Sequence, residues 1–285
     1  MFDTVAIVGM GLLGGSLGLD LKQGELARRV IGIARRAETC ALAVERGACD
    51  EAWPALEGIR DADLVVLATP VRTIIETMPQ IALHAASNAV VTDLGSTKSE
   101  IVAAGEGCLG ERFVGGHPMA GSHEGGIEAA RLGLFRAATW VFTPTDNTSL
   151  DALERLRGLA AALGARPTDI PLGDHDRIAA AVSHMPHLAA AAISRAVGEL
   201  ADGDERFGAL VGGGLRDMTR LAASPAVLWR DIFSTNRAHT RDALIVCREA
   251  LDQALAALED DGEVQRYFEG AAAAREKLIP NPRPD

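Results

Sequence analysis

The stretch TVAIVGMGLLG, from Thr4 to Gly14, determines which fold this chain adopts. Residues 4–8 form an apolar run rich in β-branched side chains, which predicts a buried strand. Three glycines follow in the spacing G-x-G-x-x-G, and residues 12–24 are expected to form a helix. A strand that passes through this spacing into a helix is the context in which a backbone turn binds the pyrophosphate of a dinucleotide. The residues expected to form this site are Gly9, Gly11, Leu12, Leu13 and Gly14.

The rest of the first half repeats this alternation of apolar strands and helices. The further strand candidates are Val30–Ile33, Leu64–Ala68, Ala89–Thr92, Phe113-Val114 and Trp140–Phe142. Continuous apolar strands joined by helices predict a parallel sheet that is covered on both faces. We therefore expect an α/β fold in which residues 1–165 form a Rossmann-like domain with a mostly parallel sheet.

The second half has a different pattern. Asp151–Leu163 is expected to be one more helix, and Arg166–Leu172 is either a last edge strand or a linker. From Asp174 onward the apolar residues recur at three- and four-residue spacing, which predicts helices only. Pro186 is expected to kink one of them, because proline lacks a backbone N–H. Residues 166–285 should thus form an all-helical domain that ends in a proline-containing tail from Ile279.

The composition excludes several classes of protein. The chain has 285 residues, a formal net charge of −11 and 48% hydrophobic residues. Nucleic-acid binding usually needs a basic surface, and an acidic chain does not provide one. No apolar run approaches the roughly 20 residues of a membrane-spanning helix. The four cysteines form no C-x-x-C pair, which fits a reducing compartment. We expect a cytoplasmic protein with no nucleic-acid or membrane partner.

The end of the second strand indicates which cofactor is bound. An acid at this position holds the ribose hydroxyls of NAD, whereas an arginine accommodates the 2′-phosphate of NADP. The sequence has Arg35 and Arg36 here and no acid between Val30 and Ala37. Two adjacent guanidinium groups suit a phosphate, so NADP is expected to be preferred, with NAD possible; the alternative is a solvated surface pair. Thr69 and Pro70, which end the strand at Leu64–Ala68, are assigned to the same site.

Three other segments carry residues suited to chemistry. They are Asp93–Lys98 (DLGSTK), Gly115–Gly121 (GGHPMAG) and Ser183–His187 (SHMPH). Ser96 taken alone can be a helix N-cap, and His117 among glycines is expected on a loop, where a structural and a catalytic role are equally plausible. His184 and His187 are three residues apart and can share a helix face. A metal site needs more ligands at suitable spacing, and none is found, so no metal is expected.

Together with the glycine motif Gly9–Ser16 (GMGLLGGS), these segments resemble the prephenate/arogenate dehydrogenase family of tyrosine biosynthesis. The resemblance covers nearly the whole chain, with all four motifs in order. It implies a Rossmann-like domain followed by a helical domain that builds a homodimer. It also implies an enzyme that oxidises a cyclohexadienyl alcohol with NAD or NADP and releases the ring carboxylate as CO₂.

The resemblance also assigns roles to individual residues. It implies that His117 is catalytic, that Ser96 orients it, and that His184 and His187 lie at the substrate. In the segment Gly214–Ala222 (GLRDMTRLA) it implies that Arg220 binds a substrate carboxylate, with Arg216 as the fallback. Many relatives place an acid two residues after GGHPMAG. Here His123 takes that position and Glu124 follows, so no acidic contact is inferred.

The expected chemistry agrees with these roles. A ring hydroxyl that loses its proton as the hydride leaves needs a neutral base, and an unperturbed imidazole has a pKa of about 6.5. Because His187 is present, prephenate is the favoured substrate, alone or together with arogenate. Three alternatives stay open at this point, and the first is an arogenate-specific NADP dehydrogenase. A β-hydroxyacid dehydrogenase requires a catalytic lysine on the helical domain, and none occurs between Lys98 and Lys277. A non-catalytic NADP-sensing module would not need His117 among glycines.

Overall fold

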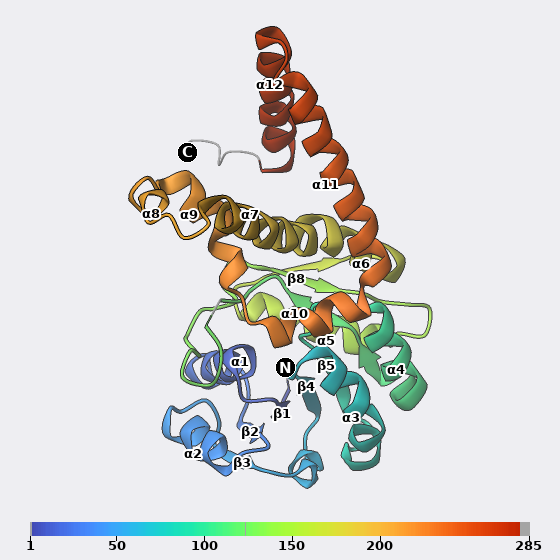
Figure 1. The fold of residues 1–285 in the computed structure, drawn as a ribbon. Coiled ribbons are helices and arrows are strands. Elements are labelled where there is room, and N and C mark those ends of the chain that lie inside the picture. Colours follow the sequence, from blue (N-terminus) through green and yellow to red (C-terminus); the bar gives the residue numbers. More distant parts are fainter. Residues whose placement is uncertain (1, 123, 280–285) are drawn as a thin grey trace, which may run out of the picture.

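A computed structural model describes residues 2–122 and 124–279 of the chain. His123 and residues 280–285 of the predicted tail lie outside the described residues. The chain forms a sheet domain, in the lower part of Figure 1, and a helical part that extends above it. Across the described residues, no helix combines the length and the apolar character needed to cross a membrane.

Within residues 2–122, six strands form one sheet that is parallel throughout, in the order β3-β2-β1-β4-β5-β6. This is the order of a Rossmann fold, and the expected fold class is confirmed. The strands are β1 (Thr4–Val8), β2 (Arg29–Ile33), β3 (Glu51–Trp53), β4 (Leu64–Leu67), β5 (Val90–Asp93) and β6 (Phe113–Val114). The sequence did not indicate β3, because this edge strand is short and its residues are half-buried or exposed.

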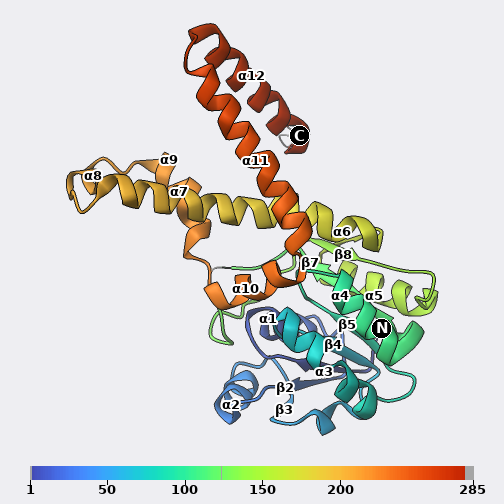
Figure 2. The same ribbon diagram turned by 45° about the vertical axis from the view of Figure 1, so that its right-hand side comes forward.

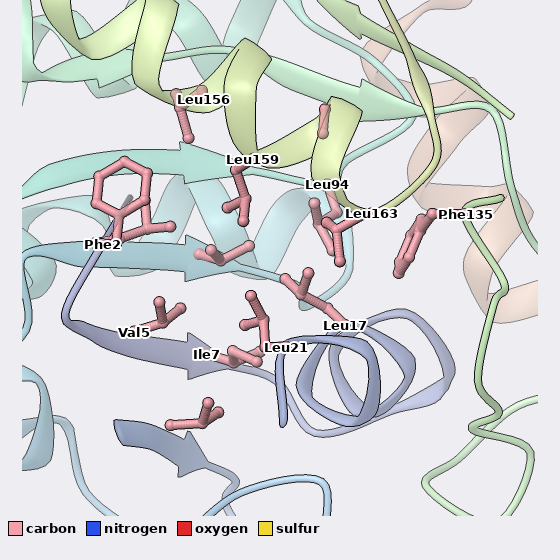
Figure 3. Close-up of a cluster of buried hydrophobic side chains, with 14 of the residues drawn as sticks. Phe2, Val5, Ile7, Leu17, Leu21, Leu94, Phe135, Leu156, Leu159 and Leu163 are labelled. Atoms are coloured by element: carbon pink, nitrogen blue, oxygen red, sulfur yellow. The ribbon is translucent and has the colours of Figure 1, made fainter. Parts of the chain in front are cut away.

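Helices cover both faces of this sheet and bury two separate clusters of apolar side chains. The strands alternate between them: Val5 and Ile7 point into one cluster, and Ala6 and Val8 into the other. Figure 3 shows the first cluster, where Leu17 of α1 and Leu159 of α5 approach the sheet. The helices are α1 (Leu12–Gln23), α2 (Ala37–Glu45), α3 (Val71–His84), α4 (Ser99–Leu109) and α5 (Leu150–Ala162).

A smaller sheet with the order β7-β8-β9 follows in the described chain. Strand β7 (Gly116–Pro118) is antiparallel to β8 (Thr139–Phe142), and β9 (Arg166–Asp169) is parallel to β8. The prediction that His117 lies on a loop is therefore wrong: its backbone pairs with Val141 in a short strand, which its glycine and proline neighbours concealed. For residues 166–169 the edge-strand alternative is confirmed. This strand begins directly after the predicted domain boundary at residue 165 and stays paired with β8.

The helical part begins with one continuous helical stretch. It consists of α6 (Leu172–Ala179), one π-helical turn (Ala180–His184) and α7 (Met185–Ala201). Pro186 does not stop this stretch, because the π turn lies directly before it and takes up the irregular geometry that a proline requires. The remaining elements are α8 (Arg206–Ala209), α9 (Gly213–Thr219), a 3₁₀ turn (Arg220–Ala223), α10 (Ala226–Thr235), α11 (Arg237–Ala257) and α12 (Asp261–Leu278).

The helices divide into a part that contacts the sheet domain and a part that does not. Figure 1 shows α10 between α7 and the sheet domain, and α10 packs against α3. The start of α11 packs against α7 and the π turn, and in both views the rest of the α11–α12 hairpin extends away from the other elements (Figures 1 and 2). Large apolar side chains along this hairpin are exposed in the single chain, among them Leu251, Leu255, Leu258 and Phe268.

Candidate active site

A cleft of about 780 Å³ lies at the carboxyl ends of β1, β2 and β4. Gly9 has φ = +109°, and a Cβ there would lie 2.7 Å from the carbonyl carbon of Ala68. A Cβ on Gly14 would lie 2.0 Å from the Gly9 oxygen, so the fold itself requires both glycines. A Cβ on Gly11 would meet no protein atom within 4 Å. Gly11 therefore leaves open space at the position where the backbone would approach a pyrophosphate.

Some of the predicted cofactor residues line this cleft, and the others lie behind its lining. Arg35 and Arg36, at the end of β2 and the start of α2, line it and are exposed, and no ion pair to either occurs among the described residues. The predicted residues that line the cleft are Gly9, Gly11, Arg35, Arg36, Thr69 and Pro70. Leu12, Leu13 and Gly14 form the first turn of α1 behind this lining. The glycine cradle and two free guanidinium groups fit a phosphate-containing dinucleotide.

A second pocket, of about 320 Å³, lies between the sheet domain and the helices. It brings together all five residues predicted to be catalytic or substrate-binding, from four different segments: Ser96, His117, His184, His187 and Arg220. Arg216 does not line it; its side chain reaches the Val211 oxygen at 3.4 Å instead. Glu124, one of the two residues that depart from the family pattern, does not line the described part of this pocket either. The other, His123, lies outside the described residues.

His117 is buried, and its ring is connected to a second histidine. Its Nδ1 atom lies 3.0 Å from Nε2 of His175 on α6, and the His175 Nδ1 lies 2.8 Å from the Asp176 carboxylate. Burial lowers the pKa of His117 well below its ordinary value, and nearby positive charge, including that of Lys98, acts in the same direction. His117 is therefore neutral at pH 7, as a general base must be. Ser96 lines the same pocket, but no hydrogen bond joins it to His117 in the described chain.

Asp176 is a buried carboxylate with an unusual set of donors. Besides His175, the backbone N–H groups of Lys98 and Ser99 at the start of α4 donate to it, at 2.7 and 2.9 Å. Burial alone would raise the pKa of Asp176, but these hydrogen bonds outweigh burial and hold the pKa well below its usual range. The carboxylate is thus ionised, and it ties α6 of the helical part to α4 of the sheet domain.

Lys98 and Asp93 form an ion pair that is completely buried. The carboxylate also accepts hydrogen bonds from the N–H groups of Gly95, at 2.8 Å, and Gly116, at 3.1 Å. Burial raises the pKa of Asp93 and lowers that of Lys98, while their mutual attraction opposes both shifts. Because Gly116 directly precedes His117, this pair fixes the backbone that carries the histidine.

The surroundings of His184 determine which of its nitrogens carries the proton. Asn236 Nδ2 donates to the carbonyl oxygen of Asp176 at 2.6 Å, and a carbonyl can only accept. The same amide nitrogen lies 3.2 Å from His184 Nδ1, which must then be the acceptor. A neutral His184 therefore carries its proton on Nε2. Burial lowers the pKa of His184 to about 4, which keeps the ring neutral.

His187 and an aromatic side chain form another wall of the pocket. The His187 ring lies over Trp229 with centroids 3.8 Å apart, and its Nδ1 donates to the Ser183 oxygen at 2.8 Å. Burial lowers the pKa of His187, and the positive charge of Arg220 adds to this. Arg220 thus lines a pocket whose histidines are neutral and contributes a positive charge to it.

Four residues of the site were missed by the sequence analysis. They are His175, Asp176, Asn236 and Trp229. Three of them lie in or at the end of a helix among polar neighbours, where nothing separates them from solvent-exposed residues. Trp229 follows three apolar residues in α10, where nothing separates it from a side chain that only packs. The only available signal was the pair His175-Asp176 close to the end of a strand, the region where open α/β sheets bind ligands.

A dinucleotide cleft beside a pocket with a neutral histidine and an arginine defines a nicotinamide-dependent oxidoreductase that acts on a small anionic substrate. The comparisons with known proteins are specific. Residues 17–168 match the family model "Prephenate dehydrogenase, nucleotide-binding domain", and residues 172–270 match "Prephenate dehydrogenase, dimerization domain". The chain belongs to the prephenate dehydrogenase family.

Individual relatives agree with this assignment. A prephenate dehydrogenase of Bacillus subtilis (strain 168) is 33% identical over 98% of this chain and 76% of that protein. Prephenate dehydrogenase from A. aeolicus in complex with hydroxyphenyl propionate and NAD⁺ has a TM-score of 0.91 at 30% identity, covering 98% of this chain and 99% of that one. Synechocystis arogenate dehydrogenase has a TM-score of 0.83 at 31% identity, covering 97% of this chain and all of that one.

The low pKa of His184 makes stability depend on pH. Between pH 6.5 and 4 the unfolded chain binds a proton at this residue that the folded chain does not. The free energy of unfolding should therefore fall as the pH drops through this window, with up to about 3 kcal/mol from His184. Urea unfolding of the wild type and of His184→Gln, at pH 8 and at steps down to pH 4.5, measures this contribution. A variant that loses stability as steeply as the wild type would contradict it.

Proposed function

We propose that this chain catalyses the oxidative decarboxylation of prephenate to 4-hydroxyphenylpyruvate, with NADP⁺ as the preferred hydride acceptor. The observation that carries the proposal is the pocket in which His117, His184 and Arg220 meet beside the dinucleotide cleft. Relatives described as prephenate, cyclohexadienyl and arogenate dehydrogenases support the same reaction class. The reaction belongs to tyrosine biosynthesis, as the family does.

The pocket residues divide the work between proton transfer and binding. Bound nicotinamide supplies the acceptor for the hydride that leaves the ring carbon of the substrate. His117 takes the hydroxyl proton at the same stage, since it is neutral and buried. Arg220 binds a carboxylate, and the N–H on Nε2 of His184 provides a further donor in the pocket. His187 completes the substrate site, and Ser96 is proposed to orient the catalytic ring.

The electron balance explains why no metal or covalent intermediate is needed. Loss of the hydride and the proton turns the ring alcohol into a ketone. The ring carboxylate then leaves as CO₂, and its bonding electrons complete an aromatic ring and place negative charge on the former hydroxyl oxygen. That oxygen can take the proton back from His117, so the base is regenerated within the same turnover.

The carboxylate-bearing side chain distinguishes prephenate from arogenate, which has an amino acid group in place of the keto acid. His187 lies in the pocket beside Arg220, and on this basis prephenate is the proposed substrate, alone or together with arogenate. Reduction of NADP⁺ by the purified protein with each substrate, followed by absorbance, tests this choice. Activity confined to arogenate would overturn it, and no activity with either substrate would overturn the proposed reaction.

Replacing His117 by Asn tests its role as the base. Asn keeps a polar side chain but cannot accept the substrate proton, so kcat should fall about 10²–10⁴-fold. The dissociation constant of NADP⁺ and the melting temperature should stay near their wild-type values. His84→Asn, at the end of α3 and outside the pocket, is the matched control and should keep wild-type kcat. A stable His117→Asn protein with more than a tenth of wild-type kcat would end the assignment.

The choice of cofactor rests on Arg35 and Arg36, which line the cleft without an acidic partner in the described chain. A charge-assisted contact to a 2′-phosphate contributes about 1.5–3 kcal/mol, which is about 10–100-fold in affinity. NADP⁺ should therefore bind more tightly than NAD⁺, and the double variant Arg35→Ala/Arg36→Ala should lose the difference. Arg60→Ala, outside the cleft, should keep it. Equal or tighter binding of NAD⁺ by the wild type would refute the preference.

We also propose that the chain works as a homodimer in which the helical half forms the interface. The exposed apolar side chains of the α11–α12 hairpin are otherwise left in water, and the matching family model is described as a dimerization domain. Sedimentation at micromolar concentration should give twice the mass of the chain. Leu255→Arg, on the hairpin, should shift the protein toward monomer, whereas Leu83→Arg, on the equally exposed face of α3, should not. A monomeric wild type would contradict the proposal.

A further inference from the structure

We propose that His175 and Asp176 are positioning residues that hold His117 in a single tautomer, with its proton on Nδ1 and its lone pair on Nε2. This inference rests on the proposed function, because it concerns how the catalytic base of that reaction is kept ready. It follows from two hydrogen bonds in series, from His117 to His175 and from His175 to Asp176.

The Asp176 carboxylate determines which atom donates in each of the two hydrogen bonds. Asp176 is an ionised carboxylate and can only accept, so His175 Nδ1 must carry a hydrogen. With its hydrogen on Nδ1, the imidazole ring of His175 presents the lone pair of Nε2, which lies 3.0 Å from His117 Nδ1. His117 Nδ1 must therefore carry the proton of its neutral ring. This leaves Nε2 of His117 as the acceptor for the substrate hydroxyl.

Asp176, the last residue of the series, is held in place by several hydrogen bonds. Asp176 is 2% exposed and is held by the backbone N–H groups of Lys98 and Ser99 at the start of α4. Its own carbonyl oxygen accepts from Asn236. The carboxylate therefore cannot rotate away, and neither His175 nor His117 has another partner for its Nδ1 atom among the described residues.

The series also provides a counter-charge for the protonated base. When His117 takes the substrate proton at Nε2 it becomes an imidazolium, and its Nδ1–H stays bonded to His175. The negative charge of Asp176, transmitted through the polar His175 ring, favours this ion. The other charged or titratable groups around His117 are Lys98 and Asp93 from the sheet domain, and His184, His187 and Arg220 from the helical part. Among the charged groups of the described residues, only Asp176 is connected to the ring by hydrogen bonds, through His175.

Two substitutions at residue 175 separate positioning from packing. His175→Phe keeps a ring but removes the acceptor, so kcat should fall about 10–100-fold with little change in KM or in NADP⁺ binding. His175→Gln offers an amide oxygen near the position of Nε2 and should recover most of this loss. In both variants the acid limb of kcat/KM should move to lower pH, because the imidazolium loses its link to Asp176. A residue that only packs would leave this limb in place.

A substitution at Asp176 gives an independent control. Asp176→Asn removes the charge and should lower kcat and move the acid limb in the same direction. Asp174→Asn, two residues away on α6 and paired with Arg177 at the surface, should change neither. Full activity with an unmoved limb in His175→Phe would overturn the inference.

A measurement without substrate keeps this test apart from the proposed function. In protein labelled with ¹⁵N-histidine, the His117 signals are assigned by their loss in His117→Asn. They should show a protonated Nδ1 and an unprotonated Nε2 in the wild type, and a mixture of tautomers in His175→Phe. The reverse tautomer in the wild type would overturn the inference. The expected tautomer together with no turnover of prephenate or arogenate would instead overturn the proposed reaction.

Discussion

The Asp93 carboxylate accepts from the Lys98 ammonium and from two backbone N–H groups, all of them out of contact with water. These donors come from the end of β5, the start of α4 and the start of β7, so one side chain joins three segments. Breaking a buried ion pair leaves an uncompensated charge, which typically costs about 3–5 kcal/mol. The position of His117, the proposed base, one residue beyond Gly116, is thereby coupled to the stability of the sheet domain.

The helical part completes the site from the other side. Asp176 binds the first N–H groups of α4, and the hydroxyl oxygens of Thr97 and Thr235 lie 2.9 Å apart where α10 meets the same turn. Arg72 of α3 adds hydrogen bonds to Ser234. These contacts are polar and buried or half-buried. Because hydrogen bonds need a definite geometry, they fix one position of the helical part on the sheet domain, which apolar packing alone would not do. The dinucleotide cleft belongs to the sheet domain alone, whereas the substrate pocket needs both parts.

The sequence predicts the fold and the cofactor cleft better than it predicts the residues of the second pocket. The strands of the parallel sheet are continuous apolar runs and the glycine turn has fixed steric requirements, so the fold and the cofactor cleft could be predicted from local pattern. His117, His184 and Arg220 were found only because whole motifs resemble a known family. His175 and Asp176 could not be found, since their role depends on a contact between α6 and β7 that no local periodicity encodes. The short strand carrying His117 was missed for the same reason, because its pairing with β8 is non-local.

The π turn at Ala180–His184 means that the site depends on the length of a segment as well as on its residues. A π turn holds one residue more than an α turn. Deleting a residue within it would leave an α turn between α6 and α7. The extra residue is taken up within the turn itself, so after such a deletion α6 and α7 would keep nearly the same relative rotation. His175 in α6 and His187 in α7 would stay in place, whereas His184, which lies inside the turn, would move, although no side chain of the site had been replaced.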